Sequence, residues 1–214
     1  MLEEATRVIL IRHGETTWNR ATRIQGHTDI PLSELGLAQA ERLAEALADE
    51  PLAAIYASDL SRARQTAEAV AGRQGLPVRI DVGLRERAFG RFEGLSWDEI
   101  AQNHPEDSAR WRKREPDFQV GGGESLVTFS ARCLAAAGRA VAAHPGQSIA
   151  LVAHGGVLDC LYRAATRTAL DAPRSWQLGN ATINRLLATP EGFTLVGWND
   201  DRHLAGLSQD DIAA

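Results

Sequence analysis

Four cationic or imidazole side chains stand at the ends of three short apolar runs. Arg12 and His13 directly follow the first run. Arg62 lies one helical turn beyond the second run, and His154 ends the third. The runs are Arg7–Ile11, Ala53–Ser58 and Ser148–His154. Ligands of open α/β sheets bind beyond the carboxyl ends of the strands, so we expect these four side chains to meet at one rim.

A cluster of this kind suits a phosphate group. An arginine stays charged and can grip phosphate through two N–H groups, and a neutral, oriented histidine can attack phosphorus. Each residue alone also has an ordinary interpretation, as a surface Arg-His pair, a core histidine or an arginine on a solvated helix face. The coincidence at three strand ends favours phosphoryl transfer through a phosphohistidine, because that reaction uses all four residues.

No motif for a metal ion or a nucleotide accompanies these residues. The sequence has no HExxH and no paired CxxC, and it lacks the glycine motifs GxxxxGK[ST], GxGxxG and GxSxG. We therefore predict no metal ligands and no cofactor.

Phosphoryl transfer to histidine also needs a proton donor for the leaving oxygen. The candidates are Glu15, Glu86, Glu93 and Asp98, and spacing does not choose among them. Glu86 and Glu93 lie in GLRERAFGRFEGL, which has no strong helical period and is typical of a functional loop. A carboxyl group beside a bound phosphate has its pKa raised by like charge, which suits a general acid.

The elements that must position these residues alternate along the chain. Helical patterns follow each apolar run, and Ser33 is placed to cap the first of them. Near the end, residues 182–188 and 193–198 flank TPEG and predict a hairpin. The alternation predicts an α/β three-layer sandwich with a mostly parallel central sheet, helices on both faces and an antiparallel edge.

Composition sets the broad class of the protein. The chain has 214 residues, 44% of them hydrophobic, and a net charge of −5, so it is not built to coat nucleic acid. No apolar run is long enough to cross a bilayer, and the N-terminus has no hydrophobic signal core. We predict a cytoplasmic protein without nucleic-acid or membrane partners, as a monomer or homodimer.

The chain shows no internal repeat and no clear linker. GGGES at 121–125 is the nearest candidate for a domain boundary, and its length and the helical pattern after it indicate a loop. We therefore predict a single domain over residues 1–214. Cys133 and Cys160 lie in separate apolar helical patterns, and we expect two reduced core thiols rather than a disulfide.

The order of motifs resembles the histidine phosphatase superfamily, also called the phosphoglycerate mutase-like family, over nearly the whole chain. The similar boxes are RHGET (12–16), QGHTDIPLSELGLAQA (25–40), SDLSRARQTA (58–67), LRERAFGRFEGL (84–95), GGGES (121–125), LVAHGG (151–156) and GNATINRL (179–186). An RHG alone would be a weak signal, but so many boxes in order are specific.

The resemblance assigns roles to the catalytic residues. His13 is the nucleophile that becomes phosphohistidine. Glu86 is the proton donor, and afterwards the base that activates water. Arg12, Arg62 and His154 hold the phosphoryl oxygens.

The resemblance also implies substrate contacts. Asn19 and Gln25 lie where family members contact phosphate or substrate, and Gly155 contributes through its backbone and small size. Glu93 is expected to be structural or on the substrate side.

The family contains both phosphatases and mutases. A mutase must shield its phosphohistidine from water with extra cations and a closing lid. Here the stretch from Glu86 to His154 is modest and the tail WNDDRHLAGLSQDDIAA is acidic, so we expect a hydrolase of small phosphorylated metabolites. The alternatives are a 2,3-bisphosphoglycerate-dependent phosphoglycerate mutase and a non-catalytic phosphate- or phosphopeptide-binding regulator. The intact nucleophile and acid argue against the regulator.

Residues 97–125 are expected to select the substrate. Trp97, Trp111 and Phe118 would supply apolar walls, and a basic run spans residues 110–114. The alternative is a solvated amphipathic helix that Trp111 docks to the body of the protein.

Overall fold

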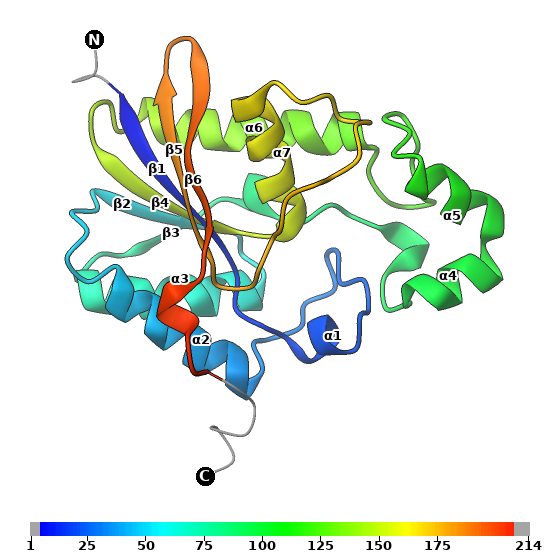
Figure 1. The fold of residues 1–214 in the computed structure, drawn as a ribbon, viewed down its shortest axis with the longest axis horizontal. Coiled ribbons are helices and arrows are strands. Elements are labelled where there is room, and N and C mark those ends of the chain that lie inside the picture. The colour runs from blue at the N-terminus through cyan, green and yellow to red at the C-terminus, as the bar shows by residue number, and fades with distance from the viewer. Residues whose placement is uncertain (1–4, 208–214) are drawn as a thin grey trace.

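A single six-stranded sheet organises the protein in the computed structural model, which describes residues 5–207 (Figure 1). The strands are β1 (Thr6–Arg12), β2 (Ala54–Ala57), β3 (Val78–Ile80), β4 (Ser148–Ala153), β5 (Ile183–Thr189) and β6 (Gly192–Asp200), in the spatial order β3-β2-β4-β1-β5-β6. β3, β2, β4 and β1 pair in parallel, and the β5–β6 hairpin adds an antiparallel edge. The three predicted apolar runs and the predicted hairpin are all strands.

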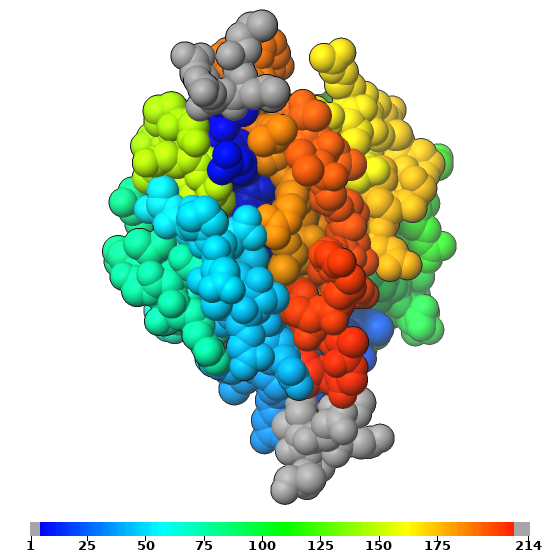
Figure 2. Space-filling model, turned by 60° about the vertical axis from the view of Figure 1, so that its left-hand side comes forward, coloured from blue at the N-terminus to red at the C-terminus, as the bar shows by residue number. Residues whose placement is uncertain are grey.

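Helices cover both faces of this sheet. The helices are α1 (Thr17–Arg20), α2 (Glu34–Ala46), α3 (Ser61–Gln74), α4 (Trp97–Asn103), α5 (Pro105–Arg112), α6 (Leu126–Ala142) and α7 (Gly155–Thr166), with short 3-10 turns at Val82–Leu84, Gly90–Phe92 and Arg202–Leu204. α2 and α3 pack on one face, and α6 and α7 pack on the other (Figure 1). The turn after β6 lies against α2, where red and blue residues meet in Figure 2.

The β1 strand shows why the sequence produces three layers. Val8 and Leu10 point into the core formed with α6 and α7, whereas Ile9 and Ile11 point into the core formed with α2 and α3. All four are at most 1% exposed. A run with no polar alternation is therefore a strand covered on both faces, and the predicted α/β sandwich is confirmed.

Helix ends follow the expected capping chemistry. The Ser33 hydroxyl accepts a hydrogen bond from the backbone N–H of Gly36 at 3.1 Å, which fixes the start of α2 as predicted. At its other end, α3 stops at Gly75, which has a φ of 64° that suits glycine. The Ser33 cap sets where the loop that follows α1 ends and α2 begins.

Residues 97–125 form a small unit of their own. The short helices α4 and α5 pack over a separate apolar cluster that contains Ile24, Phe92, Ile100, Phe118 and Val120. GGGES is a loop, as expected. Phe118 is a member of this cluster and does not line the cavity described below, which corrects its predicted role as a substrate wall.

Other predictions concern the chain as a whole. Cys133 and Cys160 are buried and free, as expected. Within residues 5–207, no helix combines the length and apolar character needed to span a bilayer. The acidic tail continues into residues 208–214, and the predicted domain includes residues 1–4; both segments lie outside the described residues. The single domain and the oligomeric state stay predictions.

Candidate active site

His13 lies where β1 ends, and its ring is held in one tautomer. Its backbone N–H donates to the carbonyl of Ala153 at 3.0 Å, which continues the β1–β4 pairing past Arg12. Its ring Nδ1 lies 2.7 Å from the Gly14 carbonyl, and because a carbonyl only accepts, Nδ1 carries the proton. The lone pair of the neutral ring is therefore on Nε2.

The surroundings of His13 keep its ring neutral. The side chain is buried, and its pKa is lowered well below the usual 6.5, first by burial and then by the charges of Arg62 and Arg12. An imidazole that is neutral at physiological pH can act as a nucleophile.

His154 lies against His13 and has the opposite tautomer. The two ring centroids are 5.2 Å apart. Arg62 Nε donates to His154 Nδ1 at 3.3 Å, so the neutral His154 ring carries its proton on Nε2. Burial and the neighbouring Arg62 lower the pKa of His154 well below 6.5. The pair thus combines one nitrogen lone pair with one N–H donor.

Arg62 is a buried cation fixed by a loop. It is 1% exposed, and its two Nη atoms donate to the carbonyls of Thr28 at 3.0 Å and Gly26 at 2.7 Å. Burial lowers its pKa to about 10, so it remains charged at neutral pH. The alternative of a solvated helix face for Arg62 is therefore wrong.

Two buried donors beside His13 lack a partner. Arg12 uses one Nη to donate to the carbonyl of Leu178. Within residues 5–207, neither Arg12 Nε nor His154 Nε2 has a hydrogen-bond partner. Buried polar groups are normally satisfied, and an anion bound beside His13 would accept from both.

Glu86 lies at the N-terminus of α7. Its Oε2 accepts from the backbone N–H of Gly156 at 3.0 Å, and its Oε1 accepts from the backbone N–H of Arg87 at 2.8 Å. A Cβ at Gly156 would overlap Glu86 Oε1 and approach the Phe129 ring to 2.9 Å. The carboxyl group can occupy this place only because residue 156 is glycine.

Gly155 has more room than its neighbour. A Cβ there would come no closer than 3.6 Å to Arg12 Nε, which is ordinary van der Waals contact. The size restriction predicted for Gly155 therefore falls on Gly156, and both glycines line the cavity.

Asn19 and Gln25 occupy the predicted substrate side. Asn19 Oδ1 accepts from the Thr16 backbone N–H at 3.0 Å as part of the capping box of α1, so its amide NH₂ is the group able to donate to a ligand. Gln25 is 8% exposed, and its Oε1 has no partner among the described residues. Both line the cavity.

One cavity of about 1150 Å³ joins the predicted residues. Its wall includes Arg12, His13, Asn19, Gln25, Arg62, Glu86 and Gly155. His154 lies immediately behind, in contact with Arg62. Within residues 5–207, no group of three or more His, Cys, Asp and Glu side chains is arranged to hold a metal ion.

Two of the other candidate carboxylates, Glu93 and Glu15, bind groups outside the cavity. Glu93 accepts from the backbone N–H groups of His27 at 3.1 Å and Thr28 at 3.0 Å, so it holds the loop that fixes Arg62. Glu15 pairs with Arg20 at 2.9 Å. Of the four candidates, Glu86 alone lines the cavity.

The basic run at residues 110–114 is divided. Arg112 and Arg114 line the far wall of the cavity with Trp97 and Trp111. Arg110 instead pairs with Glu115 at 2.7 Å. The run is therefore neither a uniform solvated face nor wholly a substrate wall, and its movement as a lid stays a prediction.

Sequence reasoning missed one supporting residue, Asn180, and one supporting contact, that of Arg114. Asn180 Nδ2 donates to the carbonyl of His13 at 2.9 Å, and the GNATINRL box was a signal for it. Arg114 has a φ of 54° and pairs with Asp159 at 2.9 Å, which ties α5 to α7. No local pattern indicates that contact, because it depends on tertiary packing.

Comparison with known proteins gives the family. The family model of the histidine phosphatase superfamily (branch 1) matches residues 8–201. The chain belongs to the histidine phosphatase superfamily.

Individual relatives of this superfamily cover most of the chain. The metal-independent phosphoserine phosphatase of Arabidopsis thaliana is 37% identical over 207 residues, which is 95% of this chain and 85% of that protein. Phosphoglycerate mutase-like protein 4 of the same plant is 37% identical over 201 residues, covering 92% and 86%. The structure of a mycobacterial glucosyl-3-phosphoglycerate phosphatase matches with a TM-score of 0.83 and 34% identity, covering 92% of this chain and 100% of that one.

These similarities confirm the predicted family, and they support the predicted enzyme class. The chain is a phosphoric monoester hydrolase of the histidine phosphatase superfamily. The fold also matches, with six strands between two helical layers. The roles of the individual site residues stay predictions.

Proposed function

We propose that the protein hydrolyses small phosphorylated metabolites without a metal ion, through a phosphohistidine at His13. One observation carries this proposal. The Nε2 lone pair of a neutral His13 lies among buried donors, and Arg12 Nε and His154 Nε2 have no partner within the described residues. That arrangement suits a tetrahedral anion whose phosphorus is attacked by histidine.

In the first step, His13 Nε2 attacks phosphorus and the ester P–O bond breaks. Glu86, in its protonated form, gives its proton to the leaving alcohol oxygen. The charges of Arg12 and Arg62 and the N–H of His154 stabilise the phosphoryl oxygens. The products are a phosphohistidine, an alcohol and a Glu86 carboxylate.

In the second step, water attacks the phosphohistidine. The Glu86 carboxylate accepts a proton from the water as its oxygen bonds to phosphorus, and the P–N bond breaks with its electron pair returning to His13 Nε2. Phosphate leaves, and the enzyme regains a protonated Glu86 and a neutral His13.

The cavity supports a substrate larger than phosphate alone. Its volume of about 1150 Å³ extends from the His13 end to a wall formed by Trp97, Trp111 and Arg112. Relatives are named for phosphoserine and for glucosyl-3-phosphoglycerate. We propose phosphorylated amino acids, sugar acids and sugars as the substrate class.

Hydrolysis of p-nitrophenyl phosphate in the presence of EDTA tests the mechanism. We expect turnover that EDTA does not reduce, and base-stable, acid-labile labelling by phosphate that His13→Ala abolishes. Turnover that EDTA removes would refute the metal-independent mechanism. An absence of turnover with every monoester would favour the binding regulator.

The mutase alternative needs its own assay. We expect hydrolysis of phosphoglycerates with or without added 2,3-bisphosphoglycerate. Rapid phosphoglycerate isomerisation that requires 2,3-bisphosphoglycerate, with little hydrolysis, would show a mutase instead.

A further inference from the structure

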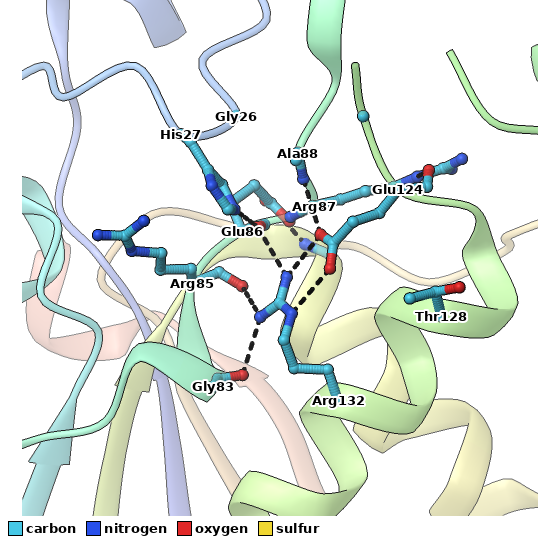
Figure 3. Close-up of polar contacts among 12 residues, drawn as sticks. Gly26, His27, Gly83, Arg85, Glu86, Arg87, Ala88, Glu124, Thr128 and Arg132 are labelled. Atoms are coloured by element: carbon cyan, nitrogen blue, oxygen red, sulfur yellow. Dashed lines mark hydrogen bonds and ion pairs between the residues drawn. The ribbon is translucent and has the colours of Figure 1, made fainter. Parts of the chain in front are cut away.

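We infer that Arg132, held by Glu124, is a positioning residue for the proton donor Glu86. This inference rests on the proposed general-acid role of Glu86. Neither Arg132 nor Glu124 lines the cavity, so both act through the chain that carries Glu86. Figure 3 shows the arrangement.

Arg132 reaches from α6 to three carbonyls of the segment that leads to Glu86. Its Nη1 donates to the carbonyls of Gly83 at 2.9 Å and Arg85 at 3.0 Å. Its Nη2 donates to the carbonyl of Glu86 itself at 3.1 Å (Figure 3). A planar guanidinium fixes several acceptors in one geometry, which a flexible ammonium does not.

Glu124 holds the same guanidinium from its other side. Its Oε1 accepts from Arg132 Nε at 2.8 Å, and its Oε2 accepts from Arg132 Nη2 at 2.7 Å. The same Oε2 also accepts from the backbone N–H of Ala88 at 2.9 Å. The clamp, which we define as Arg132 and Glu124, therefore binds the chain on both sides of Glu86.

The clamp supplies restraints that secondary structure does not. Residues 85–89 form neither helix nor strand, so no ladder of backbone hydrogen bonds fixes them. His27 Nε2 gives one more bond to the Glu86 carbonyl, at 2.8 Å. The Arg132 and Glu124 side chains are only 24% and 17% exposed, so water competes weakly for their bonds. Loss of the clamp should leave the Glu86 carboxyl misplaced relative to the leaving oxygen.

Leaving-group dependence separates positioning from general stability. An alkyl phosphate such as glycerol phosphate must have its leaving oxygen protonated, whereas p-nitrophenolate leaves as a stable anion. The constant kcat/KM reports the steps up to phosphorylation of His13, so water attack does not affect the comparison. The test compares kcat/KM for both substrates in the variants Arg132→Met, Arg132→Lys and Glu124→Gln.

We expect Arg132→Met to lower kcat/KM about tenfold more for glycerol phosphate than for p-nitrophenyl phosphate, since general acids contribute about 10²–10⁴-fold. Arg132→Lys and Glu124→Gln should show the same direction with smaller ratios. If Arg132→Met does not fold, as judged by thermal unfolding, the other two variants decide the question.

Arg139→Met is the matched control. Arg139 lies on the same helix, is 61% exposed and pairs with Asp81 at 3.0 Å. It lies outside the cavity wall. We expect both substrates to be turned over within about twofold of the wild-type rate, as for a surface ion pair.

Glu86→Gln distinguishes a failure of the proposed acid role of Glu86 from a failure of the proposed positioning role of Arg132. If Glu86→Gln lowers both substrates equally, the proposed acid role is wrong. If Glu86→Gln discriminates between the substrates but the clamp variants do not, the acid role stands and the positioning inference is overturned.

Discussion

His13 and His154 are buried side by side as neutral rings. In the unfolded chain each binds a proton below pH about 6.5. The folded chain resists that proton until the pH is well below 6.5, so between these values the unfolded state binds more protons. The free energy of unfolding therefore falls as the pH is lowered through this window. Above the window, the stability that the two neutral histidines contribute is retained in full.

We expect urea unfolding to show this loss between pH 7.5 and pH 5.5. Each histidine contributes up to about 1.4 kcal/mol per pH unit below 6.5. His13→Gln and His154→Gln should each make the dependence on pH shallower. A dependence that both substitutions leave unchanged would contradict the buried neutral state.

Gly156 lies in close contact with Glu86, the proposed proton donor. A Cβ at this position would overlap Glu86 Oε1, so Gly156→Ala must displace the carboxyl group. We expect kcat/KM for an alkyl phosphate to fall about 100-fold, in line with loss of a general acid. Steady-state kinetics on glycerol phosphate measure the effect.

Gly72→Ala is the control for a glycine-to-alanine change in a helix. Gly72 lies in α3, and a Cβ there would meet nothing within 4 Å. This variant should keep full activity and gain about 0.5–1 kcal/mol of stability. Equal activity losses in the two variants would argue against crowding at Glu86.

Among the connecting elements, the loop Gly26–Thr28 couples Glu93 to Arg62 in the proposed phosphate site. Its carbonyls fix Arg62, and its N–H groups bind the Glu93 carboxylate. Glu93→Ala leaves four donors of half-buried residues without this acceptor, because the Thr28 hydroxyl and the Phe89 N–H also donate to Glu93. We expect about 1–3 kcal/mol of lost stability and weaker competitive inhibition by inorganic phosphate.

Glu68→Gln serves as its control. Glu68 is an exposed partner of Arg64 on α3, at 3.5 Å. Urea unfolding should change by less than about 1 kcal/mol, and phosphate inhibition should be unaffected. If the Glu93 variant behaves like this control, the loop does not hold Arg62 in the way that we propose.

The sequence predicts the central strands of the sheet better than the short elements at its periphery. The β1, β2 and β4 strands were predictable because apolar runs without alternation must be covered on both faces. The three-residue β3 was not assigned, and a helix docked by Trp111 was only one alternative for residues 97–125, where α4 and α5 lie. Their apolar patterns are too short to be distinctive in the sequence. These elements are stabilised by the edge of the sheet and by the small cluster around Phe92 that they cover.

The site residues also divide into those that the sequence predicts and those that only the tertiary structure reveals. Strand ends predict that Arg12, Arg62 and His154 gather around His13, and the structure brings them together. The choice of Glu86 needed the family resemblance, because several carboxylates fit the spacing. The bonds of Arg132 to the carbonyls of Gly83 and Glu86 span 49 and 46 positions, and the contact of Arg114 with Asp159 spans 45, so no periodicity reveals them.

In the molecule as a whole, the unit of residues 97–125 packs on an apolar cluster that is separate from the two cores of the sheet. Trp111 packs on this cluster, and the Arg87 guanidinium lies 4.4 Å from its ring centroid. Trp111→Ala should speed hydrogen exchange in α4 and α5 while β1 and β4 keep their protection.

Trp97→Ala gives the comparison for this prediction. Trp97 is 46% exposed, so its removal should have a smaller effect on exchange. Exchange that rises equally in the sheet and in α4–α5 would show one cooperative unit instead of two.

The position of β1 at the centre of the sheet has a consequence for synthesis on the ribosome. Its parallel partner is β4, where Ser148 lies 141 positions after Arg7, and its antiparallel partner β5 comes later still. At about 5–20 residues per second, the ribosome needs roughly 7–28 s to make the intervening chain. Throughout that time β1, which leads to His13, has neither neighbour, and its exposed apolar residues are suited to binding a chaperone. His13, the proposed nucleophile, is thus translated well before the strands that enclose it.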